Sequence, residues 1–233
     1  MIYTSSRLRR AALAAALLAA PLLTAPFAAH AADVALYPTG PSEDSSFVRF
    51  VNTGDASISL EASGSNATLA LPPTKPASDF QPVAANKALV GAFILGTQRA
   101  PIDVTVKPGE FATVFGLVSA KGELSTKVVR ELPEDFNALR ASLAFYNLDS
   151  TCTQAGLKPA GRDVALFDSV PAGEAKRRFI NPVALSVQLV CAGKPQGAPL
   201  ALGSLAPGQR YSVFAVPATG GTRVFFTNDA LMN

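Results

Sequence analysis

The 233-residue sequence predicts an all-β protein made of two small tandem β-sandwich domains that follow a cleaved leader. Short runs rich in β-branched and aromatic residues alternate with turns, for which the chain supplies 17 glycines and 18 prolines. No long segment has the 3.6-residue periodicity of an amphipathic helix. A weak internal repeat, with matching tripeptides 95 to 100 residues apart, indicates two related domains in succession.

The first 31 residues have the order of regions that is typical of a secretory signal peptide. Three arginines within residues 7–10 form a basic head, and an uncharged Ala/Leu-rich run follows over residues 11–23. Ala29-His30-Ala31 places small residues at both cleavage-determining positions. The run is shorter than the roughly 20 apolar residues of a membrane-spanning helix. We therefore expect cleavage after Ala31, no permanent membrane anchor and a location in the periplasm.

This leader accounts for the positive charge of the chain and for its single histidine. The whole chain has 20 Lys and Arg against 17 Asp and Glu, so loss of three leader arginines makes the counts equal. A mature chain without net charge lacks the basic footprint of nucleic-acid-binding proteins, and we expect no nucleic acid partner. Loss of His30 excludes Ser-His-Asp and Cys-His catalysis and every metal site that contains histidine.

The internal repeat sets the predicted domain boundaries. Three pairs of segments match in the same order, namely 50–52 with 145–147, 81–83 with 181–183, and 107–115 with 206–214. The N-terminal domain is predicted at 32–120 and the C-terminal domain at 140–233, each with about seven short strands, enough for an immunoglobulin-like sandwich. The charged segment 121–139 is predicted to be a linker.

Two cysteines, Cys152 and Cys191, both lie in the predicted C-terminal domain. An exported protein folds in an oxidising compartment, so we expect them to form a disulfide bond. A ring of about 40 residues would add roughly 4 kcal/mol of stability in the loop-entropy model. Two buried free thiols are the alternative.

A basic run, Lys176-Arg177-Arg178, is the first candidate contact site. It lies in the segment 140–233, which carries nine Lys and Arg against five Asp and Glu. Such a run can attract an anionic polymer or an acidic partner surface. The alternative is that it protects an edge strand from aggregation.

Two tyrosines and one arginine, Tyr37, Tyr146 and Arg49, are candidate contacts with a sugar or a partner protein. Aromatic rings suit the apolar faces of sugars, but strand aromatics that complete a core are the alternative reading of the tyrosines.

The sequence has no motif of a known catalytic or cofactor site. The nucleophile elbow, the Walker loop, the dinucleotide-binding glycine motif and the EF-hand loop are all absent. The acid pairs at 43–44 and 134–135 are adjacent in sequence, unlike the separated carboxylates of glycosidases. A Ser-Lys pair such as Ser125 and Lys127 stays open. We expect no catalytic residue, no cofactor and no metal.

Five segments of the sequence carry a resemblance to a known family. They are the expected mature N-terminus and the turns of the second domain, at residues 35–38, 40–41, 45–52, 180–183 and 205–208. In these segments, and in its length and two-part layout, the chain resembles the AlgF family of periplasmic alginate O-acetylation proteins. The cysteine pair is not part of the general pattern of that family.

The resemblance implies two small β-sandwiches and a non-enzymatic role. Such a protein would act beside a membrane acyltransferase and periplasmic acetyltransferases that modify an anionic exopolysaccharide of the alginate type, or neutral cellulose. It would hold acetyltransferase and polymer together. Two alternatives stay open: a two-domain periplasmic chaperone of surface fibres, and a stand-alone polysaccharide-binding protein.

Overall fold

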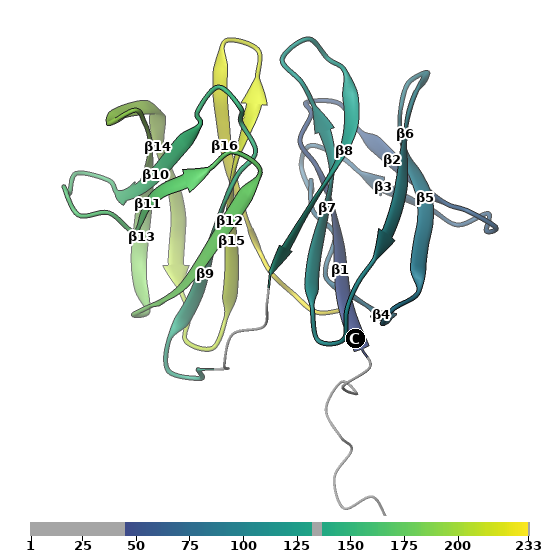
Figure 1. The fold of residues 1–233 in the computed structure, drawn as a ribbon. Helices are drawn as coiled ribbons and strands as arrows, with labels where there is room; N and C mark the ends of the chain where they lie inside the picture. The colour runs from purple at the N-terminus through teal and green to yellow at the C-terminus, as the bar shows by residue number, and fades with distance from the viewer. Residues whose placement is uncertain (1–44, 132–136, 233) are drawn as a thin grey trace, which may run out of the picture. The chain divides into compact units, whose positions relative to one another are not determined.

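Sixteen strands make up the regular structure of the computed structural model, which describes residues 45–131 and 137–232. All of them belong to one unit, residues 40–233 (Figure 1). The all-β prediction is confirmed. No helix in the described part of the chain is long and apolar enough to cross a membrane.

The N-terminal half contains two four-stranded sheets, with the strand orders β4-β1-β7-β8 and β3-β2-β5-β6. Its strands are β1 (Ser45–Asn52), β2 (Ile58–Ala62), β3 (Thr68–Leu71), β4 (Gln81–Ala84), β5 (Ala88–Leu95), β6 (Gln98–Thr105), β7 (Phe111–Val118) and β8 (Leu124–Glu131). Between the sheets lies a core that includes Val48, Ile58, Phe93 and Val114.

The C-terminal half repeats this arrangement, with the strand orders β12-β9-β15-β16 and β11-β10-β13-β14. Its strands are β9 (Ala141–Asn147), β10 (Gln154–Pro159), β11 (Phe167–Pro171), β12 (Glu174–Ile180), β13 (Val183–Cys191), β14 (Lys194–Leu205), β15 (Arg210–Ala218) and β16 (Gly221–Asn228). Each strand of the first half therefore has its counterpart eight strands later.

Strand register confirms two of the three sequence matches. Phe50 on β1 lies opposite Val114 on the parallel strand β7, and Phe145 on β9 lies opposite Val213 on β15 in the same way. The match of 81–83 with 181–183 is wrong, because residues 81–83 lie on β4, whereas Asn181 and Pro182 lie between β12 and β13.

The sheets β4-β1-β7-β8 and β12-β9-β15-β16 are covered on both faces along their central strands, whereas their edge strands β8 and β12 keep exposed residues. One face of each packs on the outer sheet of its own half, and the other faces pack on each other (Figure 1). The cluster between these two inner sheets includes Val51, Phe115, Tyr146 and Phe214. Every residue of β9 is buried, because both of its side-chain directions point into a core.

The segment 121–139, predicted to be a linker, contains the whole of β8. This strand pairs with β7 over eight residues, from Phe111↔Glu131 to Val118↔Leu124. Its charged residues Lys127 and Arg130 are exposed, whereas Val129 is buried. The high charge of the segment therefore marks an edge strand of the first sandwich.

The predicted disulfide bond is confirmed between Cys152 and Cys191, whose Cα atoms are 5.4 Å apart. Cys152 lies in the loop between β9 and β10, and Cys191 ends β13, the strand that pairs with β10, so the bond fastens this loop to the outer sheet.

An asparagine at the end of the first strand of each half holds the loop that follows. Asn52 Nδ2 donates to the carbonyl oxygens of Ala56 and Leu71, both at 2.7 Å, and its Oδ1 accepts from the Gly54 N–H.

Asn147, the register equivalent of Asn52, makes the same set of bonds in the second half. Its Nδ2 donates to the carbonyl oxygens of Cys152 (2.7 Å) and Val170 (3.0 Å), and its Oδ1 accepts from the Asp149 N–H. Both asparagines are fully buried.

Replacement of either asparagine by alanine is expected to lower the free energy of unfolding by about 1–3 kcal/mol, because buried carbonyl groups lose their donors. Urea unfolding of Asn52→Ala and Asn147→Ala measures this. Asn181→Ala, an exposed asparagine between strands, is the control and should change stability by less than about 0.5 kcal/mol.

Candidate functional site

Four charged side chains meet where the two inner sheets face each other. Arg49 lies on β1, Arg177 on β12, Glu131 at the end of β8, and Asp229 directly after β16. Arg49 Nη1 lies 2.5 Å from Asp229 Oδ1, and the two side chains are 1% and 0% exposed. Arg177 lies 2.5 Å from Glu131 and 2.9 Å from Asp229. Two positive and two negative charges therefore balance in the interior.

Hydroxyl groups complete the hydrogen bonding of Arg49. Its Nε donates to Thr113 Oγ1 (2.9 Å), and its Nη2 donates to Ser212 Oγ (2.8 Å) and Tyr146 Oη (3.0 Å). Ser212 in turn donates to Asp229 Oδ2 at 2.8 Å. Buried ions persist only when they are paired and fully hydrogen-bonded in this way.

Some positions of the cluster have the same kind of side chain in both halves, whereas the position of Arg49 does not. Thr113 is the register equivalent of Ser212, and Glu131 is the equivalent of Asp229. The equivalent of Arg49 is Ala144, which carries no charge. One arginine from each half thus converges on two equivalent acids, so the cluster joins the halves.

Charge pairing sets the protonation states in this cluster. Burial alone would raise the pKa of Asp229, but the charges of Arg49 and Arg177 and the hydrogen bonds from Ser212 and Arg177 outweigh it, and the pKa lies below its ordinary value. Burial likewise opposes the charge of Arg177, but Glu131 and Asp229 raise its pKa above the ordinary value. The charge pairing and the hydrogen bonds therefore favour the ionised forms of both side chains.

The lowered pKa of Asp229 predicts acid sensitivity. Because its folded-state pKa lies below the unfolded value, the carboxylate stabilises the fold above the unfolded pKa, and this contribution is lost as the pH falls through the folded pKa. The free energy of unfolding is expected to decline below about pH 4. Urea titrations between pH 7 and pH 2.5 should show a smaller decline in Asp229→Asn; an equal decline would contradict the assignment.

This cluster can join the two sandwiches, but it presents no group to a substrate. Its ionisable atoms are bonded to one another and shielded by aromatic residues; the Arg49 guanidinium lies 4.5 Å from the ring centroid of Phe80. In the described part of the chain, no three His, Cys, Asp or Glu side chains lie close enough together to hold a metal ion.

Arg49 and Tyr146, predicted as surface contacts, are buried at 1% and 0% exposure, so that prediction is wrong. Both lie on the faces of inner sheets that the other half covers, and Tyr146 packs on Phe115 and Phe214. Tyr37 and the expected cleavage site at Ala31 lie outside the described residues.

The basic run splits between surface and interior, because side chains alternate along β12. Lys176 and Arg178 are exposed, whereas the Arg177 side chain is only 4% exposed and belongs to the buried cluster. Lys176 Nζ donates to the carbonyl oxygens of Asp168 and Ser169, and Arg178 donates to that of Leu166. Lys176 and Arg178 therefore have the geometry expected of residues that protect an edge strand.

Sequence reasoning missed Glu131 and Asp229. The internal repeat is the signal that could have indicated them. Glu131 lies 18 residues after Thr113, and Asp229 lies 17 residues after Ser212, the repeat counterpart of Thr113.

Structural and sequence comparisons place the chain among known proteins. The C-terminal domain of AlgF from P. aeruginosa is 21% identical; the alignment covers 39% of this chain and 98% of that domain, with a TM-score of 0.33. A candidate cell adhesion protein from Bacteroides ovatus is 7% identical over 81% of this chain and 98% of that one, with a TM-score of 0.26. At these TM-scores neither alignment establishes the fold.

A search among curated proteins finds no match. A family model described as "Alginate O-acetyl transferase AlgF" matches residues 19–211, which is most of the sequence. The chain therefore belongs to the AlgF family.

Proposed function

We propose that this protein is a non-catalytic periplasmic accessory protein that supports O-acetylation of an alginate-type exopolysaccharide by positioning an acetyltransferase and the polymer. Holding both on one rigid body raises their effective concentration without any new chemistry. Membership of a family named for alginate O-acetylation supports the pathway.

The buried charged cluster supports the proposal that this protein is not itself an enzyme. The buried ionisable side chains form ion pairs that join the two halves, and burial prevents their contact with a substrate. They are Arg49, Arg177, Glu131 and Asp229. The only histidine, His30, lies in the expected leader. The expected mature chain therefore lacks histidine, the most frequent general base of acyl transfer.

Lys176 and Arg178 are the proposed contacts with an anionic polymer or an acidic partner surface. Both are exposed on the edge strand β12, and their hydrogen-bond partners among the described residues are backbone carbonyl groups. The double variant Lys176→Glu/Arg178→Glu is expected to weaken binding roughly tenfold at low salt and less at high salt.

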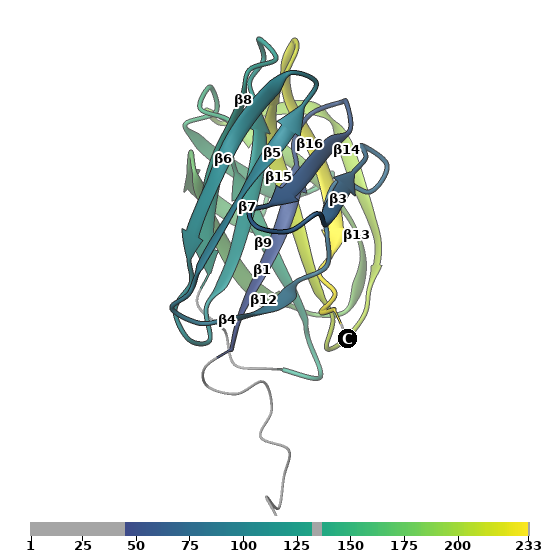
Figure 2. The same cartoon turned by 90° about the vertical axis from the view of Figure 1, so that its right-hand side faces the viewer.

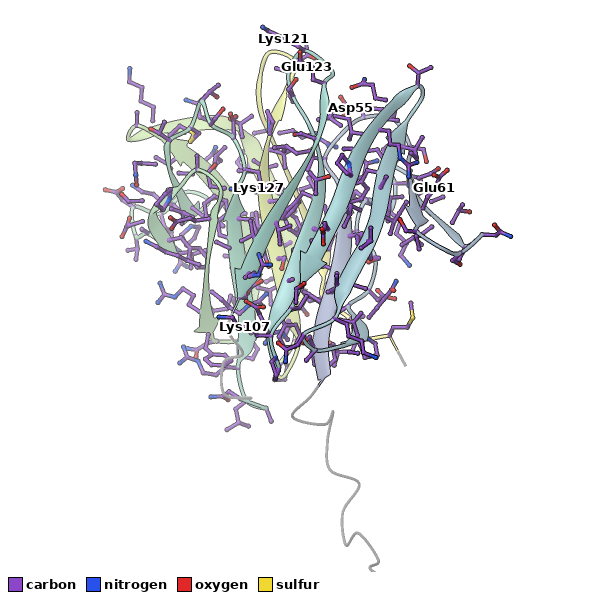
Figure 3. All side chains as sticks on the ribbon, turned by 45° about the vertical axis from the view of Figure 1, so that its right-hand side comes forward. Asp55, Glu61, Lys107, Lys121, Glu123 and Lys127 are labelled. Carbon is purple, nitrogen blue, oxygen red and sulfur yellow. A yellow bond between two sulfur atoms is a disulfide. The ribbon has the colours of Figure 1, made fainter. Side chains whose placement is uncertain are left out.

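Lys121→Glu is the matched control, because this exposed lysine lies in the β7–β8 turn of the other sandwich (top of Figure 3); the variant should bind normally. Biolayer interferometry with the purified acetyltransferase and with the polymer measures both interactions. Unchanged binding of the double variant to both would remove these residues from the contact surface.

Acetyl content of the secreted polysaccharide tests the proposed function. NMR of polymer from the wild type and from a deletion strain complemented in trans should show loss of acetyl esters with polymer yield retained. Unchanged acetylation would refute the proposal and leave the fibre-chaperone and stand-alone polysaccharide-binding readings.

A further inference from the structure

The two long sides of the 40–233 unit end in different sets of sheet edges. On one side β8 meets β12 through the Glu131–Arg177 ion pair, and β6 and β11 are the neighbouring outer edges. On the other side the chain after β16 bonds to the residue before β4: Phe80 N–H donates to Ala230 O, and Met232 N–H donates to Phe80 O. Figure 2 shows β6 and β8 along one side and β3 and β14 along the other.

Polar side chains close the edges of the first side. Gln98 on β6 accepts from the Leu124 N–H of β8, and Arg130 on β8 donates to the Thr105 carbonyl at the end of β6. On the same side of the second half, Lys176 and Arg178 of β12 bond to the carbonyl groups around β11. These are the devices by which proteins block strand addition.

The second side has one long edge strand with a single charged side chain, Arg223, which bonds to the Thr53 and Gly54 carbonyl groups and to Asp55 of the first half. β3 and β4 have only four residues each. β14 is interrupted by Pro195 and Pro199, which lack an N–H, and by shifts of register. β16 has eight residues with an unbroken register, contains no proline or lysine, and lies at the end of its sheet.

Backbone groups on the free edge of β16 are available for pairing. The Asp229 N–H donates to Arg210 O on the β15 side, and the direction of the N–H groups alternates along an antiparallel strand. The N–H and C=O groups of Val224, Phe226 and Asn228 therefore point away from β15. No hydrogen bond from these groups to another described residue is present.

The equivalent strand in the first half shows what β16 lacks. Register places Phe225 at the position of Lys127 on β8, and Asn228 at the position of Arg130. Both cations of β8 are exposed edge residues, and Figure 3 shows Lys127 on this strand. The charges that guard one edge are absent from its counterpart.

Charge defines the partner. β14 and β16 together contain Lys194 and Arg223 and no acidic residue. Arg223 is already paired with Asp55 at 3.5 Å, so an added strand would meet a border of Val224 and Phe226 without net charge. A segment that alternates apolar with uncharged polar residues fits this border.

We propose that the free edge of β16 binds an extended segment of the partner acetyltransferase as an added strand. The inference rests on the proposed function, because that function supplies the partner. Main-chain hydrogen bonds to Val224, Phe226 and Asn228 would provide affinity, and the apolar side chains of Val224 and Phe226 would favour apolar residues in the added strand.

Val224→Pro tests the edge, because it removes a central outward N–H from a strand position where proline is tolerated. Val224→Ala is the matched control, since it trims the same side chain but keeps the N–H. If Val224→Pro does not fold, Asn228→Pro at the exposed end of β16 replaces it. Binding of the purified acetyltransferase to the full mature chain is measured by calorimetry, and amide hydrogen exchange is followed at Val224 and Phe226.

We expect wild type and Val224→Ala to bind alike, the proline variant to bind about 10- to 100-fold more weakly, and exchange at Val224 and Phe226 to slow in the complex. Equal binding of the proline variant, or unchanged exchange in a formed complex, would overturn the edge site and leave the accessory function intact. Absence of any binding by the wild type would overturn both.

Discussion

Asp229→Asn is expected to lower the free energy of unfolding by about 3–5 kcal/mol, because it leaves Arg49 and part of Arg177 as buried charges without a counter-ion. The substitution keeps the shape of the side chain and removes only the charge. Ser212 also loses its carboxylate acceptor. Equilibrium unfolding in urea at pH 7, followed by circular dichroism, measures the change.

An exposed ion pair gives the matched control for this experiment. Arg99 lies 2.8 Å from Glu61, but their side chains are 57% and 46% exposed (Figure 3 labels Glu61). Arg99→Ala should cost less than about 1 kcal/mol. If Asp229→Asn costs no more than Arg99→Ala, the buried cluster does not hold the two sandwiches together.

The double variant Cys152→Ala/Cys191→Ala is expected to be less stable than the wild type by about 4 kcal/mol. The bond closes a sequence separation of 39 residues, which includes β10, β11 and β12, so its loss releases a long loop in the unfolded chain. Removal of both cysteines avoids a leftover thiol.

Reductant provides the internal control for the disulfide. Dithiothreitol should bring the wild type to the stability of the double variant and should leave the double variant unchanged. Equal stability of the oxidised wild type and the double variant would show that the bond is not a stabilising element.

The sequence predicted the fold class and the repeat because both leave local traces. Turn residues and strand-length apolar runs mark the sheets, and segments 50–52 and 145–147 occupy equivalent positions of β1 and β9. Local charge misled the assignment of 121–139: Lys127 and Arg130 on β8 make an edge strand look like a solvated linker.

The repeat marks Glu131 and Asp229 as equivalent positions, but it does not show that they pair with Arg49 and Arg177, because these partners are remote in sequence. Arg49 and Asp229 are 180 residues apart, and their ion pair depends on how the inner sheets of the two halves face each other. Strand alternation does separate Arg177 from Lys176 and Arg178, but the sequence does not say which face is covered. Burial of Arg49 and Tyr146 follows from that covered face.

The most direct test of the accessory role is an acetyl-transfer assay with purified components. The initial rate of acetyl transfer to the polymer is measured with the acetyltransferase alone, with this protein alone, and with both. The accessory role predicts no turnover by this protein alone and a higher rate when both are present at low concentration. Acetyl transfer by this protein without the acetyltransferase would contradict it.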